Sequence, residues 1–128
     1  MSGEIVGKKY DAVTFDTKKD HVAAFARAVG ADPAAGVPPT YAFVGAFQTG
    51  VQMVLDEEAK VNLAMLVHGE QEFTWERHPE VGEALSATGT VASDEDRRGL
   101  RFLTLETKVA DADGKPVLTS RMLNVIRG

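Results

Sequence analysis

Residues 40–55, TYAFVGAFQTGVQMVL, contain no charged side chain, although 26% of the whole chain is charged. Pro38 and Pro39 precede this stretch closely, a position that suits the start of a helix. Within it, Gly45 and Gly50 let a neighbouring backbone approach closely. A helix that is apolar on every side belongs in an interior, so another part of the chain must enclose it. We expect its large side chains to lie mostly in the core: Tyr41, Phe43, Val44, Phe47, Val51 and Val54.

The composition fits one globular domain over residues 1–128, since 44% of the chain is hydrophobic. The absence of cysteine excludes disulfides and thiolate metal ligands. The net charge is −5 and the basic residues are scattered, so no nucleic-acid partner is expected. The N-terminus lacks an apolar leader segment, and no run approaches the ~18 apolar residues of a membrane span. We therefore expect a cytoplasmic protein that does not associate with a membrane.

The periodicity of the chain predicts a strand, two helices and a run of strands. Residues 11–16 alternate as a short strand, and residues 18–29 have helical spacing with Thr17 and Asp20 as a capping pair. Four further strands are predicted at 67–76, 84–92, 100–109 and 116–126, joined by turns at 78–82, 93–99 and 111–115. This is an α+β order. A curved antiparallel sheet wrapped around the central apolar helix, the hotdog fold, satisfies it; a cystatin-like or other helix-on-sheet fold is the alternative.

The segment VHGEQEFTWE, residues 67–76, places His68 two residues before Glu70 in a predicted strand. A period of two puts Val67, Phe73 and Trp75 on the inner face and His68 on the polar face. Three interpretations of His68 follow: a solvated strand residue, a residue lining a pocket or dimer seam, and a base oriented by Glu70. No two histidines have the close spacing of a metal-binding motif, so no metal site is expected.

Three passages resemble the MaoC-like dehydratases, in particular their N-terminal domain or the Had-type subunits of (3R)-hydroxyacyl-thioester dehydratases. They are VTFDTKKDHVAAFARAVGADP, VPPTYAFVGAF and LVHGEQEFTWERHPEVGEAL. The third contains Arg77-His78-Pro79-Glu80-Val81-Gly82-Glu83, which is similar to the family's R-P-x-x-x-G-D turn. The resemblance covers most of the chain. It implies a hotdog fold, hydro-lyase chemistry on an acyl-CoA or acyl carrier protein substrate, and no cofactor.

The chain departs from this family where the catalytic residues stand. The family's catalytic half carries G-D-x-N-P-x-H, whose Asp and His supply general acid/base catalysis. Here the loop reads Gly30-Ala31-Asp32-Pro33-Ala34-Ala35 and is one residue short. Anchoring on Gly30 puts Ala31 at the aspartate, and anchoring on Pro33 puts Ala35 at the histidine; Asp32 takes the aspartate position only if the gap falls before it. Asp32 and His68 are the fallback candidates. We therefore expect no catalytic residue in this chain and a MaoC-like partner chain that brings the dyad.

The resemblance also suggests where an acyl thioester would lie. Free N–H groups at the start of the 40–55 helix would point at the thioester carbonyl. The residues expected to contact substrate are Pro39, Thr40, Phe43, Phe47, His68 and Gly69. The leading hypothesis is thus an accessory subunit that shapes the acyl pocket of a hydratase or dehydratase, paired with a MaoC-like subunit or with a second copy of itself.

Two other functions remain open at this stage. A hotdog thioesterase places a carboxylate on the central helix in many cases, whereas residues 40–55 offer only Gln48 and Gln52; Asp56 or Glu57 would have to serve instead. A non-enzymatic homodimer that binds an acyl or lipid group would have the same composition. An adjacent reading frame with an intact G-D-x-N-P-x-H motif would favour the dehydratase complex over this third possibility.

Overall fold

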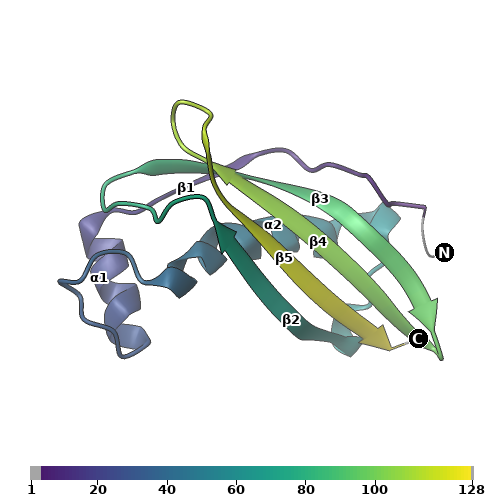
Figure 1. The fold of residues 1–128 in the computed structure, drawn as a ribbon. Helices are drawn as coiled ribbons and strands as arrows, with labels where there is room; N and C mark the ends of the chain where they lie inside the picture. The colour runs from purple at the N-terminus through teal and green to yellow at the C-terminus, as the bar shows by residue number, and fades with distance from the viewer. Residues whose placement is uncertain (1–3, 128) are drawn as a thin grey trace.

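A five-stranded antiparallel sheet and two helices make up the fold in the computed structural model, which describes residues 4–127 (Figure 1). The strands are β1 (Val13–Asp16), β2 (Leu66–Trp75), β3 (Ala84–Arg97), β4 (Leu100–Ala110) and β5 (Pro116–Arg127). The helices are α1 (Lys19–Ala28) and α2 (Phe43–Leu55), with short 3₁₀ turns at Pro39–Ala42, Glu57–Ala59 and Leu63–Met65. The order β1-β3-β4-β5-β2 leaves β1 and β2 at the edges. The sheet curves around α2, which confirms the predicted α+β hotdog arrangement.

Helix α2 turns its small side chains toward the sheet. The buried residues of the helix are Gly45, Ala46, Thr49, Gly50 and Met53. The Thr49 hydroxyl lies 2.7 Å from that of Thr107 in β4, and a Cβ at Gly89 in β3 would come within 3.0 Å of the Thr49 Cβ. Small residues thus allow the helix and sheet backbones to approach closely.

The opposite side of α2 is uncovered within this chain. Phe47 is 56% exposed, Val51 39% and Leu55 73%. The prediction that Phe47 and Val51 belong to the core is therefore wrong for the chain by itself. The physical reason is that one sheet covers only one side of a helix, so an all-round apolar helix leaves its second face for something else.

Two apolar clusters fill the space between α2 and the sheet. The first surrounds Phe15, Val22 and Tyr41 near the start of the helix, and the second surrounds Met53, Leu103 and Leu105 near its end. Met53, Leu103 and Leu105 have no exposed surface, and full burial of such a side chain contributes about 1.5–3 kcal/mol. The clusters hold the two ends of α2 on the sheet.

The start of α1 differs from the prediction. No side chain caps its first turn, and Lys18 occupies the N-cap position. The fully buried Thr17 instead donates its hydroxyl to Glu80 O at 2.6 Å and accepts a hydrogen bond from Glu83 N–H at 2.7 Å. The predicted capping pair of Thr17 and Asp20 is thus wrong, because a contact distant in sequence takes the hydroxyl.

The β3–β4 connection is also shorter than predicted. Strand β3 continues to Arg97, and the turn is formed by Arg98 and Gly99, whose φ angles are 53° and 80°. The expected loop at 93–99 is wrong because its charges are paired across the strands: Arg101 donates to both carboxylate oxygens of Asp94, at 2.8 and 2.9 Å. A paired carboxylate can be buried in a strand, as Asp94 is.

The segment before β1 runs along β3 and extends that edge of the sheet. Gly7 N–H donates to Val91 O, and Tyr10 N–H donates to Gly89 O, both at 2.8 Å. Lys8 and the Tyr10 hydroxyl both bind the Asp56 carboxylate just after α2, at 2.8 and 2.7 Å. The Lys8 ammonium, with Tyr10, lowers the pKa of Asp56 below its ordinary value.

Candidate functional site

A β-bulge in β2 decides which side chains face α2. His68 pairs with Asn124 of β5, whereas Glu70 pairs with Leu123, so Gly69 is one residue more than its partner strand supplies. A bulge shifts the alternation by one residue and can re-aim a neighbouring side chain. Gly69 packs closely against Val125 of β5 because it has no side chain. A Cβ added at this position would lie 3.1 Å from Val125 Cγ2.

The bulge reverses the orientation predicted for the first part of this strand. Val67, expected to face inward, is 62% exposed, and His68, expected on the polar face, points to the helix side. The imidazole stacks on Phe43 at the start of α2, with ring centroids 5.6 Å apart and planes inclined by 22°. Beyond the bulge, Phe73 and Trp75 pack against the first apolar cluster, as predicted.

Along the exposed side of α2 runs an apolar groove of about 380 Å³. Helix α2 contributes Phe43, Phe47, Gly50, Val51, Val54 and Leu55. The opposite wall consists of Leu63, Leu66, His68, Met122 and Asn124. Phe43 and Leu55 are separated by about 18 Å of helix axis, so the groove is elongated. An apolar groove with a few polar groups is suited to a chain-like apolar ligand.

Of the six residues predicted to contact substrate, the structure brings Phe43, Phe47 and His68 together in this groove. Gly69 shapes the wall as the bulge residue without lining it. Pro39 and Thr40 are exposed in the 3₁₀ turn before α2 and do not line the groove. The N–H groups of Tyr41 and Phe43 already donate to carbonyls of this turn, so two of the donors expected to be free at the helix start are occupied.

Residues 30–35, the loop expected to correspond to the dyad-bearing loop of catalytic MaoC-like chains, hold one carboxylate, Asp32, in a local hydrogen bond. Asp32 accepts a hydrogen bond from Ala34 N–H at 2.9 Å, and its own carbonyl accepts one from Ala35 N–H at 3.1 Å. The Asp32 carboxylate therefore closes a local turn. Neither Asp32 nor the neighbouring Ala31 and Ala35 lines the groove. Asp32 and His68 therefore do not line the same pocket.

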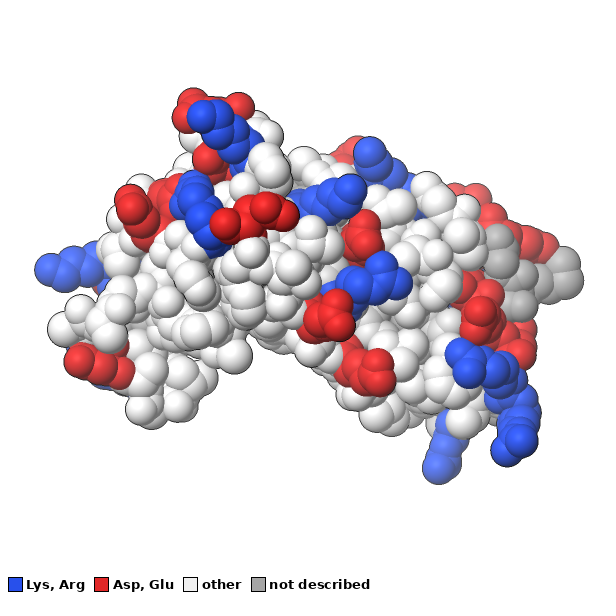
Figure 2. All heavy atoms as spheres, viewed as in Figure 1, with Lys and Arg blue, Asp and Glu red and all other residues white. Residues whose placement is uncertain are grey.

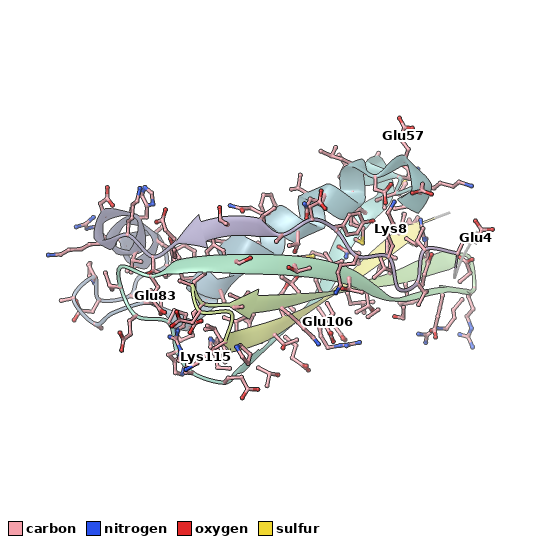
Figure 3. All side chains as sticks on the ribbon, turned by 90° about the horizontal axis from the view of Figure 1, so that it is seen from above. Glu4, Lys8, Glu57, Glu83, Glu106 and Lys115 are labelled. Carbon is pink, nitrogen blue, oxygen red and sulfur yellow. The ribbon has the colours of Figure 1, made fainter. Side chains whose placement is uncertain are left out.

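The turn that resembles R-P-x-x-x-G-D joins three loops. Arg77 donates to both oxygens of Glu83 at 2.9 and 2.6 Å and to Asp111 at 3.2 Å. Arg77 lowers the pKa of Glu83, whereas backbone N–H donation, chiefly from Lys115, is the largest cause of the lowered pKa of Asp111. Figure 3 shows Glu83 near the β4–β5 hairpin that carries Lys115. The turn thus stabilises one end of the fold.

The two sides of the sheet differ in polarity. Glu106 points away from α2 on the other side of the sheet (Figure 3), where Arg121 pairs with it at 2.8 Å. Figure 2 shows acidic and basic side chains interspersed over this view of the molecule. Within residues 4–127, no group of three His, Asp or Glu side chains is arranged to hold a metal ion. No helix in the described part of the chain has the length and apolar character needed to cross a membrane.

Reasoning from the sequence missed Leu63, Leu66, Met122 and Asn124 as groove residues. Asn124 carried one usable signal, because an amide in a strand between apolar residues requires a hydrogen-bonding partner. The others carried none, because apolar residues such as these fit an ordinary core equally well.

Comparison with known proteins places the chain among dehydratase domains. The model of the family described as "FAS1-like, dehydratase domain region" matches residues 4–120. A UPF0336 protein of Leifsonia xyli is 34% identical over 116 residues, which cover 91% of this chain and 73% of that protein. A UPF0336 protein of Clavibacter michiganensis is 34% identical over 125 residues, covering 86% of this chain and 84% of that protein.

Solved structures share the fold at lower sequence identity. A chain of the truncated HadBC (3R-hydroxyacyl-ACP dehydratase) complex of Mycobacterium tuberculosis has a TM-score of 0.81 at 20% identity, covering 98% of this chain and 99% of that one. A MaoC-like dehydratase has a TM-score of 0.84 at 18% identity, covering 97% of this chain but 42% of that protein. The (R)-hydratase of A. caviae has a TM-score of 0.67 at 17% identity, with 93% and 94% coverage.

Proposed function

The chain belongs to the FAS1-like, dehydratase domain region family, and from this premise we propose that it is an accessory subunit of a (3R)-hydroxyacyl-thioester dehydratase or enoyl-thioester hydratase. Its groove would hold the acyl chain of a CoA or acyl carrier protein thioester. A MaoC-like partner chain would bring the aspartate and histidine that act on the β-carbon.

One observation supports this proposal: the chain has an elongated apolar groove, and the loop that we align with the family's catalytic loop contains no histidine. Ala31 and Ala35 cannot transfer a proton, and the Asp32 carboxylate is engaged in a turn. The groove beside α2 nevertheless offers an apolar surface of a kind that acyl chains bind. A binding surface without its own acid and base supports a division of labour between two chains.

The uncovered face of α2 supports a protein partner. Phe47, Val51, Leu55 and Leu63 line the groove as exposed apolar residues. Contiguous exposed apolar surface marks interaction sites. Strand β2 is moreover an edge strand, paired only with β5 among the described residues, so its outer backbone groups can extend the sheet into a second chain.

We infer that the partner has the same fold. The dehydratase from M. tuberculosis is described as a HadBC complex, and a single chain of it superposes over almost all of the present chain. A MaoC-like partner that carries G-D-x-N-P-x-H would cover the groove and place its dyad at the acyl chain. A second copy of the present chain would cover the same surface but would leave the pair without a dyad.

The groove gives less support to a thioesterase. Among the described residues that line it, none is Asp or Glu. Asp56, the carboxylate nearest the end of α2, is bound by Lys8 and Tyr10 and does not line the groove. A hydrolytic water would thus have no carboxylate of this chain to activate it.

The test is to purify the chain, a MaoC-like chain with the intact motif from the same genome, and the two together. Each preparation is assayed for hydration of trans-2-enoyl-CoA and for hydrolysis of acyl-CoA. We expect activity in the co-purified pair and none in the present chain alone. Substantial hydration by this chain alone would refute the accessory role, hydrolysis would favour the thioesterase, and a stable, inactive homodimer that binds acyl groups would favour the binding protein.

Two variants sharpen this test. Leu63→Ser removes a 64% exposed side chain from the groove, and Val81→Ser removes a 44% exposed side chain from the β2–β3 turn. We expect Leu63→Ser to weaken association with the partner and Val81→Ser to leave it unchanged. Equal effects of the two variants would argue that the groove face is not the interface.

A further inference from the structure

We propose that His68 and Asn124 together form a recognition point for a hydroxyl group on the acyl chain, so that the groove distinguishes hydroxyacyl from unsubstituted chains. The inference rests on the proposed function, because it assumes that the groove holds an acyl chain. It adds that the accessory chain itself forms hydrogen bonds to an oxygen atom of the ligand.

His68 and Asn124 are the polar exceptions among the residues that line the groove. The remaining lining residues are aliphatic, aromatic or glycine, with Met122 as a thioether. Binding pockets commonly use a few placed polar groups in an apolar lining to fix the orientation of a ligand. Since His68 and Asn124 face each other across β2 and β5, their Cα atoms belong to one cross-strand pair. Side chains of such a pair on the same face lie within reach of a single ligand atom.

The backbone of β2 turns His68 inward through the bulge at Gly69. If Gly69 were paired regularly instead of bulged, alternation from Gln71, Phe73 and Trp75 would send His68 to the opposite face of the sheet. The bulge interrupts strand pairing, and glycine is needed for its close fit against Val125. The resulting stack on Phe43 fixes the plane of the imidazole. His68 stays exposed to solvent beside the open groove, but a merely solvated histidine would require none of these features.

Both side chains retain hydrogen-bonding capacity. The imidazole nitrogens of His68 make no hydrogen bond to another described residue. Asn124 is 4% exposed and donates one N–H to Leu103 O at 3.3 Å, which leaves its carboxamide oxygen and second N–H. A neutral imidazole offers one donor and one acceptor, and a carboxamide offers both kinds of group. A hydroxyl, which donates and accepts at the same oxygen, matches this pair, whereas a methylene matches neither.

The test compares binding of two probes to the full chain, 3-hydroxytetradecanoyl-pantetheine and tetradecanoyl-pantetheine, by isothermal titration calorimetry. A net hydrogen bond contributes about 0.5–1.5 kcal/mol, so we expect the hydroxylated probe to bind roughly two- to tenfold more tightly. His68→Phe keeps an aromatic ring on Phe43 without the nitrogens and should abolish this preference. His68→Gln retains hydrogen bonding and should preserve part of it.

His78→Phe serves as the matched control, because His78 also stacks on an aromatic residue, Trp75, outside the groove, with ring centroids 5.3 Å apart. This variant should keep the full preference. If the wild-type chain binds both probes equally, the recognition point is refuted while an acyl-binding groove stands. If it binds neither probe, the acyl-binding role of the groove fails as well. Retention of the preference in His68→Phe would also overturn the inference.

Discussion

The two buried glycines of α2 should respond in opposite directions to the same substitution. At Gly45, an alanine Cβ would lie 2.5 Å from Cε1 and 2.9 Å from Cζ of Phe15, a buried ring of the first apolar cluster. Overpacking of this kind costs about 1–3 kcal/mol, against a gain of about 0.5–1 kcal/mol from replacing a helical glycine. Gly45→Ala should therefore lower the free energy of unfolding by about 1–2 kcal/mol.

At Gly50 the same Cβ would meet Met122 Cε and Sδ at 3.4 Å, which is ordinary van der Waals contact with a flexible side chain. The overpacking cost is then absent, and only the gain in helix propensity remains. Gly50→Ala should raise the free energy of unfolding by about 0.5–1 kcal/mol. The two variants should thus differ by roughly 1.5–3 kcal/mol.

Urea denaturation followed by circular dichroism, at one fixed protein concentration, measures this difference directly. The slope of the free energy against urea should stay unchanged, because neither substitution alters the surface exposed on unfolding. Phe15→Leu, which removes the clashing ring atoms, should reduce the penalty of Gly45→Ala in the double variant. A Gly45→Ala protein as stable as wild type, or equal losses at both glycines, would refute the reasoning.

Three further predictions concern the turn, the acid response and the exposed face. Thr17→Val should lower the free energy of unfolding by about 2 kcal/mol in thermal or urea denaturation, because it leaves Glu83 N–H unpaired, and by more than Thr17→Ser, which keeps the hydroxyl. Because Arg77 lowers the folded-state pKa of Glu83, this carboxylate stabilises the fold above its unfolded pKa of about 4.3, and the contribution is lost as the pH falls through the folded value. Denaturation from pH 7 to pH 3 should accordingly show a weaker acid response in Glu83→Gln, and an unchanged response would contradict the ion pair. Phe47→Ser should reduce self-association or partner binding in analytical ultracentrifugation without loss of monomer stability, since that side chain is 56% exposed; a large loss of stability would indicate a core role.

The periodicity of the sequence was sufficient for the fold class and for most of the elements. Helix α1 (Lys19–Ala28) lies within the predicted 18–29, and the strands predicted at 100–109 and 116–126 match β4 and β5 within one residue at each end. These elements have a regular period and pack on one covered face, so local pattern and tertiary structure agree.

The errors arose where a residue acts through a distant partner or an added residue. Thr17 looks like a helix cap, but its hydroxyl binds the turn at Glu80 and Glu83. The acidic stretch around Asp94 looks like a loop, but Arg101 on the next strand pairs with that carboxylate. In both cases the local signal was genuine and a long-range contact overrode it.

The error at His68 has a larger consequence for function. A single inserted glycine reverses the inward and outward faces of a strand, and nothing in VHGEQEFTWE distinguishes that glycine from an ordinary strand residue. The reversal moves the histidine from a row of glutamates into the groove beside Phe43. The residue type was enough to single out His68 as a candidate. Which groups surround His68 depends on the register of β2, which the sequence pattern did not reveal.

The same limit applies to the central helix, and it bears on the division of labour that we propose. An apolar helix that is enclosed on both sides implies two covering surfaces, but the sheet of this chain supplies one and leaves Phe47 and Leu55 exposed. The loop at Ala31 and Ala35 has no histidine and holds its one carboxylate, Asp32, in a local turn, and the groove lacks a cover. A single MaoC-like partner would supply both missing parts at once, whereas a second copy of this chain would supply only the cover. We therefore expect activity and burial of the groove to appear together when the two chains associate.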